Sequence, residues 1–308
     1  LMPLVFATRP SALARIQTQW VIQALQRVHP KLICEEKVIT TQGDRILNKP
    51  LPEIGGKGLF TQELEHELLS GAVHCAVHSL KDLPIENPLG LTLGCIPERA
   101  DARDVLISAR QYTLFTLPKG ALVGTSSTRR AAQLLANRPD LVMRSLRGNV
   151  DTRLRKALEG QYDAIVLAGA GLTRLGLEEN ITEWLSLENM LPAPGQGALA
   201  VQCRTDDPTT LDLLMTLEDS ATRRAVTAER QFLLALGGGC TAPVAAFAAM
   251  SGDSAGTIRL KGRILSPDGK QAVEVAGQGL DAAALGNDLA RQALQQGAQA
   301  LLDLPVGG

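Results

Sequence analysis

The sequence predicts an α/β protein with two doubly wound lobes, a hinge and a cleft between them, and a small C-terminal α+β domain. Short apolar strands alternate with amphipathic helices through the first two-thirds of the chain, which is the pattern of βαβ units around a largely parallel sheet. This pattern occurs twice, and the segments 97–103 and 192–197 are the expected crossings between the two lobes. The last third contains consecutive strands and helices, which indicates an antiparallel sheet.

Composition agrees with two or three domains. The 308 residues are 45% hydrophobic and 20% charged, as is ordinary for a globular protein. Because the net charge is −1, we expect neither nucleic acid nor an anionic membrane as a partner. No apolar run approaches the roughly 18 residues that a membrane helix requires, and residues 1–7 are interpreted as a strand rather than a signal peptide. Five cysteines without paired spacing predict no metal site and no disulfide framework, so we expect the cytoplasm.

The first lobe is expected to comprise residues 1–97 and 198–216. Ser11 caps its first helix, and apolar residues recur at helical spacing as far as Val28. The other elements of this lobe are predicted from short apolar runs and one further amphipathic segment: strands at 4–7, 32–40, 75–77, 91–96 and 198–203, and a helix at 59–69.

The second lobe is expected at 103–192 and the C-terminal domain at 220–308. The second lobe repeats the strand–helix pattern, with strands at 121–124, 141–146 and 164–168, helices at 128–136 and 150–158, and a short helix after the turn 169–171. The C-terminal domain contains helices at 222–236 and 281–302 and strands at 244–249, 258–265 and 272–276. The turn Ser266–Lys270, with its Pro-Asp-Gly core, joins the last two strands.

Residues 43–58 have no predicted helix or strand. Structureless segments of this length are uncommon inside compact domains and are often lids. Lys57 lies between Gly56 and Gly58, so flexible backbone would carry a cation to a ligand that enters and leaves. A surface loop without function is the alternative.

Three segments place hydroxyl groups and arginines where a predicted strand ends and a helix begins: Thr8–Ser11, Gly124–Arg130 and Arg147–Arg153. The carboxyl ends of parallel strands share one edge of a sheet, where helix N-termini present free backbone N–H groups. With guanidinium groups added, such an edge suits carboxylates or phosphates. The alternative for each segment is a helix cap beside a solvated arginine, but three such segments favour an anion site. The glycine patterns of nucleotide-binding loops are missing from the sequence, so we expect carboxylates.

The segment His78–Pro84 directly follows a predicted strand and contains Lys81 and Asp82. An acidic group at the carboxyl end of a strand can act as a general acid or base, or stabilise a cation. A surface Lys–Asp pair ahead of a proline is the alternative. For His78 itself, a structural role in a buried strand is the simpler interpretation.

Cys240 follows three glycines and precedes Thr241. A thiol on a glycine-rich loop beyond a helix is accessible, unlike Cys75 and Cys95 in apolar strands, and can act as a nucleophile or covalent anchor. The alternative is a small apolar side chain that fills a turn.

These motifs together resemble the porphobilinogen deaminase family over essentially the whole chain. The resemblance depends on the order and spacing of seven segments: 7–11 (ATRPS), 55–60 (GGKGLF), 76–84, 124–130, 147–150, 191–198 (LPAPGQGA) and 229–243 (ERQFLLALGGGCTAP).

The resemblance implies an enzyme of tetrapyrrole synthesis that joins four porphobilinogen molecules head to tail, releases ammonia, and frees hydroxymethylbilane by hydrolysis. It implies a dipyrromethane cofactor bound to Cys240 through a thioether, and Asp82 as the catalytic residue. The further cofactor contacts that it implies are Ser79, Lys81, Asp82, Thr125, Ser126, Ser127, Arg129, Arg130 and Arg147, and the substrate contacts are Arg9, Ser11, Gln17, Arg147, Arg153 and Arg174. It also implies two periplasmic-binding-protein-like lobes, a third domain that bears the cysteine, and a monomer.

Two other function classes remain open on the residues alone. A solute-binding module would use the same lobes and anion-binding loops without catalysis and would not need Cys240. A cysteine-dependent redox or acyl-transfer enzyme would carry Cys240 as a reactive free thiol. The mass of the purified protein separates these classes, because only a covalent cofactor adds mass.

Overall fold

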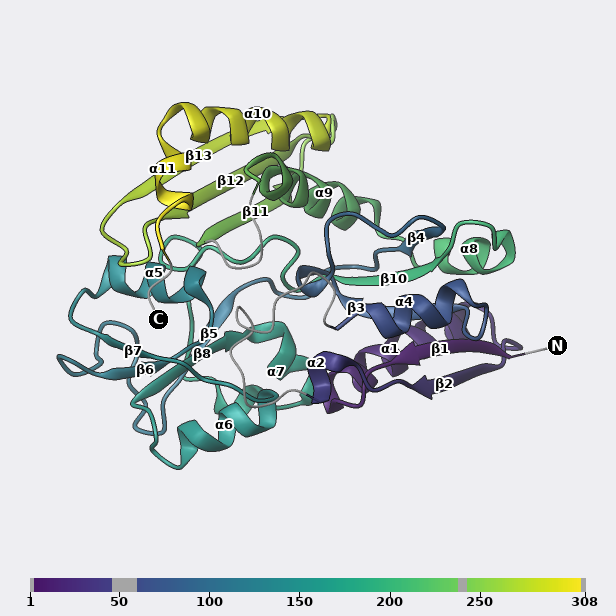
Figure 1. The fold of residues 1–308 in the computed structure, drawn as a ribbon, viewed down its shortest axis with the longest axis horizontal. Coiled ribbons are helices and arrows are strands. Elements are labelled where there is room, and N and C mark those ends of the chain that lie inside the picture. Colours follow the sequence, from purple (N-terminus) through teal and green to yellow (C-terminus); the bar gives the residue numbers. More distant parts are fainter. Residues whose placement is uncertain (1–2, 46–59, 238–242, 306–308) are drawn as a thin grey trace. The chain divides into compact units, whose positions relative to one another are not determined.

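The computed structural model describes residues 3–45, 60–237 and 243–305 (Figure 1). The chain divides into two compact units: Leu1–Ala100 with Gly197–Arg223, and Asp101–Gln196 with Arg224–Gly308. The second unit contains both the second lobe's sheet and the C-terminal sheet, and a finer division into three domains stays a prediction. Among the described residues, no helix combines the length and apolarity that crossing a bilayer requires.

The first unit is built on a mixed five-stranded sheet of order β2-β1-β3-β10-β4. Its strands are β1 (Leu4–Thr8), β2 (Cys34–Val38), β3 (Cys75–Ser79), β4 (Leu91–Cys95) and β10 (Leu199–Arg204). Strand β1 pairs in parallel with β2 and β3, whereas β10 runs antiparallel to both β3 and β4. The expected return of the chain to the first sheet through β10 is therefore confirmed.

Helix α1 begins where the sequence predicts it. The Ser11 hydroxyl accepts a hydrogen bond of 3.3 Å from the Ala14 N–H, which satisfies one of the free donors of the first turn. The apolar face of α1 packs on the sheet through Val21 and Leu25, which are fully buried with Phe6. The helices of this unit are α1 (Ala12–Val28), α2 (Gln42–Arg45), α4 (Gln62–Leu69), the 3-10 turn η1 (Leu80–Asp82) and α8 (Pro208–Met215).

The second unit contains another mixed five-stranded sheet, of order β7-β6-β8-β5-β9. Strand β6 pairs in parallel with β7 and β8, and β5 runs antiparallel to β8 and β9. The strands are β5 (Asp104–Ile107), β6 (Leu122–Gly124), β7 (Val142–Arg144), β8 (Ala164–Ala168) and β9 (Glu183–Trp184), and the helices are α5 (Thr128–Asn137), α6 (Val150–Leu158), α7 (Gly169–Leu175) and the turn η2 (Glu178–Asn180).

The C-terminal sheet has helices packed on one of its faces (Figure 1). A Cβ on Gly262 would lie 2.4 Å from the Phe232 ring of α9, and a Cβ on Gly277 would lie 3.1 Å from Leu289 of α10, so glycine lets both helices approach closely. The sheet consists of β11 (Val244–Met250), β12 (Ile258–Leu265) and β13 (Ala272–Gly279), all antiparallel, and the helices are α9 (Ser220–Ala235), α10 (Ala282–Gln295) and α11 (Ala298–Leu302).

Some sequence expectations need correction. Four of the five strands in each of the two larger sheets run in one direction, as the largely parallel pattern predicts, and only β10 and β5 run in the opposite direction. Strands β5 and β9 and helix α8 were not expected, because each segment is too short to show the regular spacing of apolar residues that indicates a strand or a helix. The closing helix is two helices, separated where Gly297 takes a left-handed φ of 94°. The expected turn 169–171 is already the first turn of α7.

We expect Phe232→Ala to lower the free energy of unfolding by about 3–5 kcal/mol, because the ring is fully buried between α9 and β12 and its loss leaves a cavity. Denaturant unfolding followed by circular dichroism measures this. Leu280→Ala is the control: its side chain is 61% exposed, so the change should stay within about 0.5 kcal/mol. Equal losses in the two variants would contradict the role of Phe232 in this core.

Candidate active site

One edge of the first unit's sheet gathers several of the predicted residues. Strands β1 and β3 are parallel neighbours with Ala7 opposite Ala76, so the residues that follow each strand meet at the same edge. Arg9 follows β1, and η1 follows Ser79 at the end of β3. The two segments therefore share one carboxyl edge of the sheet.

Arg9 is held in place by a carboxylate and an aromatic ring. Its Nε and Nη2 donate to Asp44 at 3.2 and 2.5 Å, and its guanidinium carbon lies 4.2 Å from the centre of the Phe60 ring. Thr41 also donates to Asp44, through its backbone N–H and its hydroxyl. Burial acts to raise the pKa of Asp44, but the bonds from Arg9 and Thr41 outweigh it and hold this pKa below its usual value. The Nη1 edge of Arg9 donates to no described residue, so it can bind a ligand carboxylate.

Asp44 was not expected from the sequence. It lies in a short, polar, glycine-containing stretch that gives no periodic signal, and α2 has only four residues. A fork-shaped Asp–Arg pair across 35 residues of chain is visible only in the folded structure.

Gln17, Ser79 and Ser11 have structural partners. The Gln17 side-chain amide donates to the Ser79 hydroxyl at 3.0 Å, which joins α1 to the end of β3. The Ser11 hydroxyl is engaged as the cap of α1. A ligand that contacts these side chains would therefore compete with the hydrogen bonds that they already make within the protein at this edge of the sheet.

Asp82 is presented to solvent on a rigid turn. Leu80 anchors this turn, because it is fully buried and its backbone N–H donates to Ala198 at 3.0 Å. The Leu83 N–H closes the turn on Leu80 at 3.2 Å. The side chain of Asp82 is exposed, and no described residue donates a hydrogen bond to its carboxylate. Lys81, next to it, is half-buried.

His78 is buried in β3, and no catalytic role is proposed for it. Burial lowers its pKa to about 4, and the positive charge of Arg9 acts in the same direction. The imidazole is therefore neutral at neutral pH.

The second unit gathers its predicted residues in the same way. Because β6 is parallel to both β7 and β8, the loops after these three strands lie at one edge of the sheet. These loops lead into α5, α6 and α7; the predicted arginines of this unit lie on these helices, except Arg147, which lies on the loop before α6.

The hydroxyl groups of this edge shape its loops. Ser126 donates to the Leu146 carbonyl at 2.7 Å and accepts from the Leu146 N–H at 3.0 Å, which ties the loop after β6 to the loop after β7. Ser127 caps α5, since its hydroxyl accepts from the Arg130 N–H at 3.4 Å. Thr125 accepts from the Ser127 N–H at 3.2 Å.

Arg129 and Arg130 share one buried carboxylate, that of Asp104 at the start of β5. Arg129 donates to Asp104 at 2.8 Å through Nη1. Arg130 donates to it through Nε at 3.0 Å, and its Nη2 forms an ion pair with the same carboxylate at 2.8 Å. Each also binds a carbonyl, at Leu191 and Val166 respectively. The sequence predicted both arginines as ligand contacts, but part of each guanidinium is already bound to protein. Asp104 was not expected, because the strand that it begins was not predicted.

The other arginines of this edge differ in how they are held. Arg147 is half-buried, and its guanidinium has no partner among the described residues. Arg153 donates through Nε to the Gly148 carbonyl at 2.7 Å. Burial lowers the pKa of Arg174 to about 10, which leaves it positively charged at neutral pH.

Two predicted residues, Lys57 and Cys240, lie outside the described residues. Cys240 falls between the end of α9 and the start of β11. Cys95 and Cys203 are unsuited to be reactive thiols, because burial raises the pKa of Cys95 to about 12 and that of Cys203 to about 11, so both stay protonated. Cys75 is fully buried beside them.

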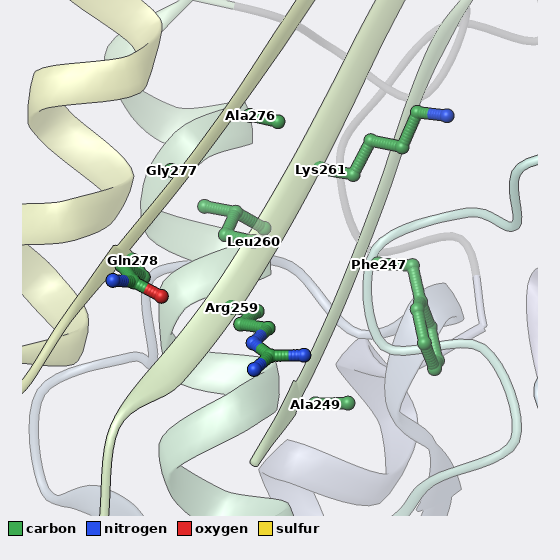
Figure 2. A pocket seen from close by; sticks show the side chains of 8 residues that line it. All are labelled: Phe247, Ala249, Arg259, Leu260, Lys261, Ala276, Gly277 and Gln278. Atoms are coloured by element: carbon green, nitrogen blue, oxygen red, sulfur yellow. The ribbon is translucent and has the colours of Figure 1, made fainter. Parts of the chain in front are cut away.

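A hollow of about 430 Å³ lies elsewhere, on the open face of the C-terminal sheet. Figure 2 shows Arg259 and Lys261 of β12 and Phe247 of β11 at this hollow. None of the residues that line it belongs to the predicted site, so the hollow and the site are separate features of the chain.

Two family descriptions match the chain. Residues 4–212 match "Porphobilinogen deaminase, dipyromethane cofactor binding domain", and residues 223–295 match "Porphobilinogen deaminase, C-terminal domain". The chain is 51% identical over 291 residues to the porphobilinogen deaminase of Brevibacillus brevis, with 94% of each chain covered. It is 52% identical over 300 residues to that of Roseiflexus castenholzii (97% of this chain, 98% of the relative) and 47% identical over 297 residues to that of Bacillus subtilis (96% and 94%).

Solved structures resemble the chain only weakly. The substrate-binding domain of a putative molybdenum ABC transporter from Clostridium difficile is 13% identical with a TM-score of 0.42, over 74% of this chain and 96% of that one. The VFT2 domain of Bordetella pertussis BvgS is 16% identical with a TM-score of 0.39, over 68% and 84%.

We expect the protein to lose stability as the pH falls from 6.5 to 4, partly through His78. The unfolded state takes up a proton near pH 6.5, whereas folded His78 does so only near its pKa of about 4, so acid favours unfolding. This contribution is roughly 3 kcal/mol between about pH 7 and pH 4. Urea unfolding of His78→Gln across this range should show a smaller pH dependence than the parent protein. His66→Gln, at an exposed position, is the control, and equal pH dependence in both variants would contradict the assignment.

Proposed function

Because the chain belongs to the porphobilinogen deaminase family, we propose that it condenses four porphobilinogen molecules head to tail with release of ammonia, and then hydrolyses the product to hydroxymethylbilane. This makes it a transferase of porphyrin and heme biosynthesis. The observation that carries the proposal is the match of both family domains along the chain, at about half identity to relatives of the same length.

The charge of the substrate explains the residue types at the two sheet edges. Each porphobilinogen carries an acetate and a propionate group, so a growing chain of pyrroles is a polyanion. Among the described residues, the Nη1 edge of Arg9 in the first unit and the guanidinium of Arg147 in the second have no partner, so both can bind such carboxylates. We propose the same role for Arg153, Arg174 and the lid residue Lys57, and substrate contacts for Ser11 and Gln17.

The residues of the second unit suit an anionic cofactor. The Nε and Nη2 groups of Arg129 donate to no described residue, and Arg129 belongs to the first turn of α5. The proposed cofactor is a dipyrromethane held through a thioether to Cys240, and when bound it supplies the pyrrole carbon to which new units are added. The further contacts proposed for it are Ser79, Lys81, Thr125, Ser126, Ser127, Arg130 and Arg147.

Asp82 is the proposed catalytic residue. Positive charge develops on a pyrrole ring when ammonia leaves, and a carboxylate beside the ring nitrogens stabilises that charge and accepts or returns a proton. The exposure of Asp82 and the buried anchor Leu80 support this role, since the carboxylate is accessible and the turn that holds it is fixed.

We further infer that the enzyme acts as a monomer in the cytoplasm and without nucleic acid. The net charge of −1 supports the last point, because binding to a phosphate backbone depends on a surplus of basic residues.

The cofactor proposal is tested by the intact mass of the purified protein. We expect the parent protein to exceed its polypeptide mass by two pyrrole units, and Cys240→Ala to lack both this mass and activity. Cys34→Ala, at a half-buried thiol, should keep the added mass. A fully active protein without added mass would exclude the covalent cofactor and favour a simple binding or free-thiol mechanism.

Asp82→Asn should retain the cofactor mass but lower kcat by about a hundredfold or more, since removal of a general acid–base group costs ~10²–10⁴ in rate. Steady-state turnover of porphobilinogen measures this. Asp206→Asn serves as the control, because its side chain is 84% exposed and carries no proposed role. Turnover of Asp82→Asn equal to that of Asp206→Asn would remove Asp82 from the mechanism.

A further inference from the structure

A fully buried carboxylate organises the arginine pair of the second unit. The Asp104 side chain is 0% exposed, and the guanidinium groups of Arg129 and Arg130 are 6% and 8% exposed. Gln196 adds a third contact, since its amide donates to Asp104 at 3.0 Å and to the Ala102 carbonyl at 2.7 Å. Asp104 therefore accepts hydrogen bonds from both arginines and from a glutamine, all within one unit.

These contacts determine which N–H groups stay available. Both N–H groups of Arg129 Nη1 are taken, by Asp104 and by the Leu191 carbonyl at 2.7 Å, so Nε and Nη2 remain. Arg130 donates Nε–H to Asp104 and one N–H of Nη1 to Val166 at 3.3 Å, and its Nη2 forms an ion pair with Asp104 at 2.8 Å. Each guanidinium is thereby fixed in orientation and retains N–H groups that no described residue uses.

The same contacts set the charge of the cluster. Two guanidinium groups and one carboxylate leave a net charge of +1. Asp104 and Arg130 are the charged groups that act on Arg129, and burial lowers the pKa of Arg129 while Asp104 opposes this effect. A single ligand carboxylate would neutralise the cluster, whereas a doubly charged anion would leave surplus negative charge beside the buried Asp104, which is unfavourable at low local dielectric.

We propose that Asp104 is a positioning residue that orients Arg129 and Arg130 toward one carboxylate of the oligopyrrole and lowers their affinity for doubly charged anions such as phosphate. This inference rests on the proposed function for the identity of the carboxylate. Selectivity arises because the negative charge of Asp104 repels a doubly charged anion more strongly than it repels a single carboxylate.

The test compares Asp104→Asn with the parent protein, using inorganic phosphate as the probe. The phosphate response is measured with Cys240→Ala added to both proteins, so that no covalent cofactor occupies the arginines, and turnover is measured without that change. Removal of the negative charge raises the net charge of the cluster to about +2, so phosphate should stabilise the variant against heating at about tenfold lower concentration than the parent protein. Its turnover of porphobilinogen should also fall about tenfold or more, because the arginines lose their orientation. Asp140→Asn is the matched control: Asp140 also pairs with an arginine, Arg138, but near the opposite end of α5.

A double variant, Asp104→Asn with Arg130→Gln, restores the net charge to +1 and should return the phosphate response to that of the parent protein. It also covers the case in which the single variant does not fold, since the restored charge balance should permit folding. The inference is overturned if Asp104→Asn responds to phosphate as Asp140→Asn does, if the double variant keeps the raised response, or if neither Asp104 variant folds. The phosphate response needs no turnover, so a parent protein that did not convert porphobilinogen would refute the proposed function alone.

Discussion

Parallel strand pairing is the constraint on which both sets of proposed site residues depend. In each unit, three neighbouring strands run in the same direction, and their carboxyl ends therefore form one edge. Residues far apart in the sequence, such as Arg9 and Asp82, reach the same edge only because β1 lies beside β3. The antiparallel strands β10 and β5 begin at these same edges, so Leu199 lies opposite Ser79 and Asp104, the first residue of β5, lies opposite Ala168 at the end of β8.

Electrostatic preorganisation follows from this arrangement. Cations that gather at one edge repel one another and lose hydration, and a protein carboxylate offsets part of this cost before a ligand binds. Asp44 supplies this carboxylate for Arg9, and Asp104 supplies it for the pair at the start of α5. The guanidinium groups are thereby oriented during folding, and a ligand carboxylate does not have to order them on binding. Partner carboxylates also limit the positive charge that the edges present.

The fold was predictable wherever a local signal was strong. Helix α6 and strands β8 and β12 have the predicted limits, because amphipathic spacing and apolar runs act within a few residues of chain. Strand β5 escaped prediction because its four residues are too few to show a period, and they are buried only through their pairing with β8 and β9. The break at Gly297 was equally hidden, because a helical apolar pattern continues on both sides of it.

The sequence by itself determined the family, the chemical types at the site and the strand ends that carry them, since the motifs at Arg9, Asp82 and Arg129 are local features of the chain. Only the tertiary structure decided which groups are already engaged. Asp44 and Asp104 are separated from their arginines by 35 and 25 residues, and no local pattern encodes a pair that forms through burial and sheet order. The physical reason is that charge pairing in a folded protein depends on distance in space and on exclusion of water, and both arise only when the sheets assemble.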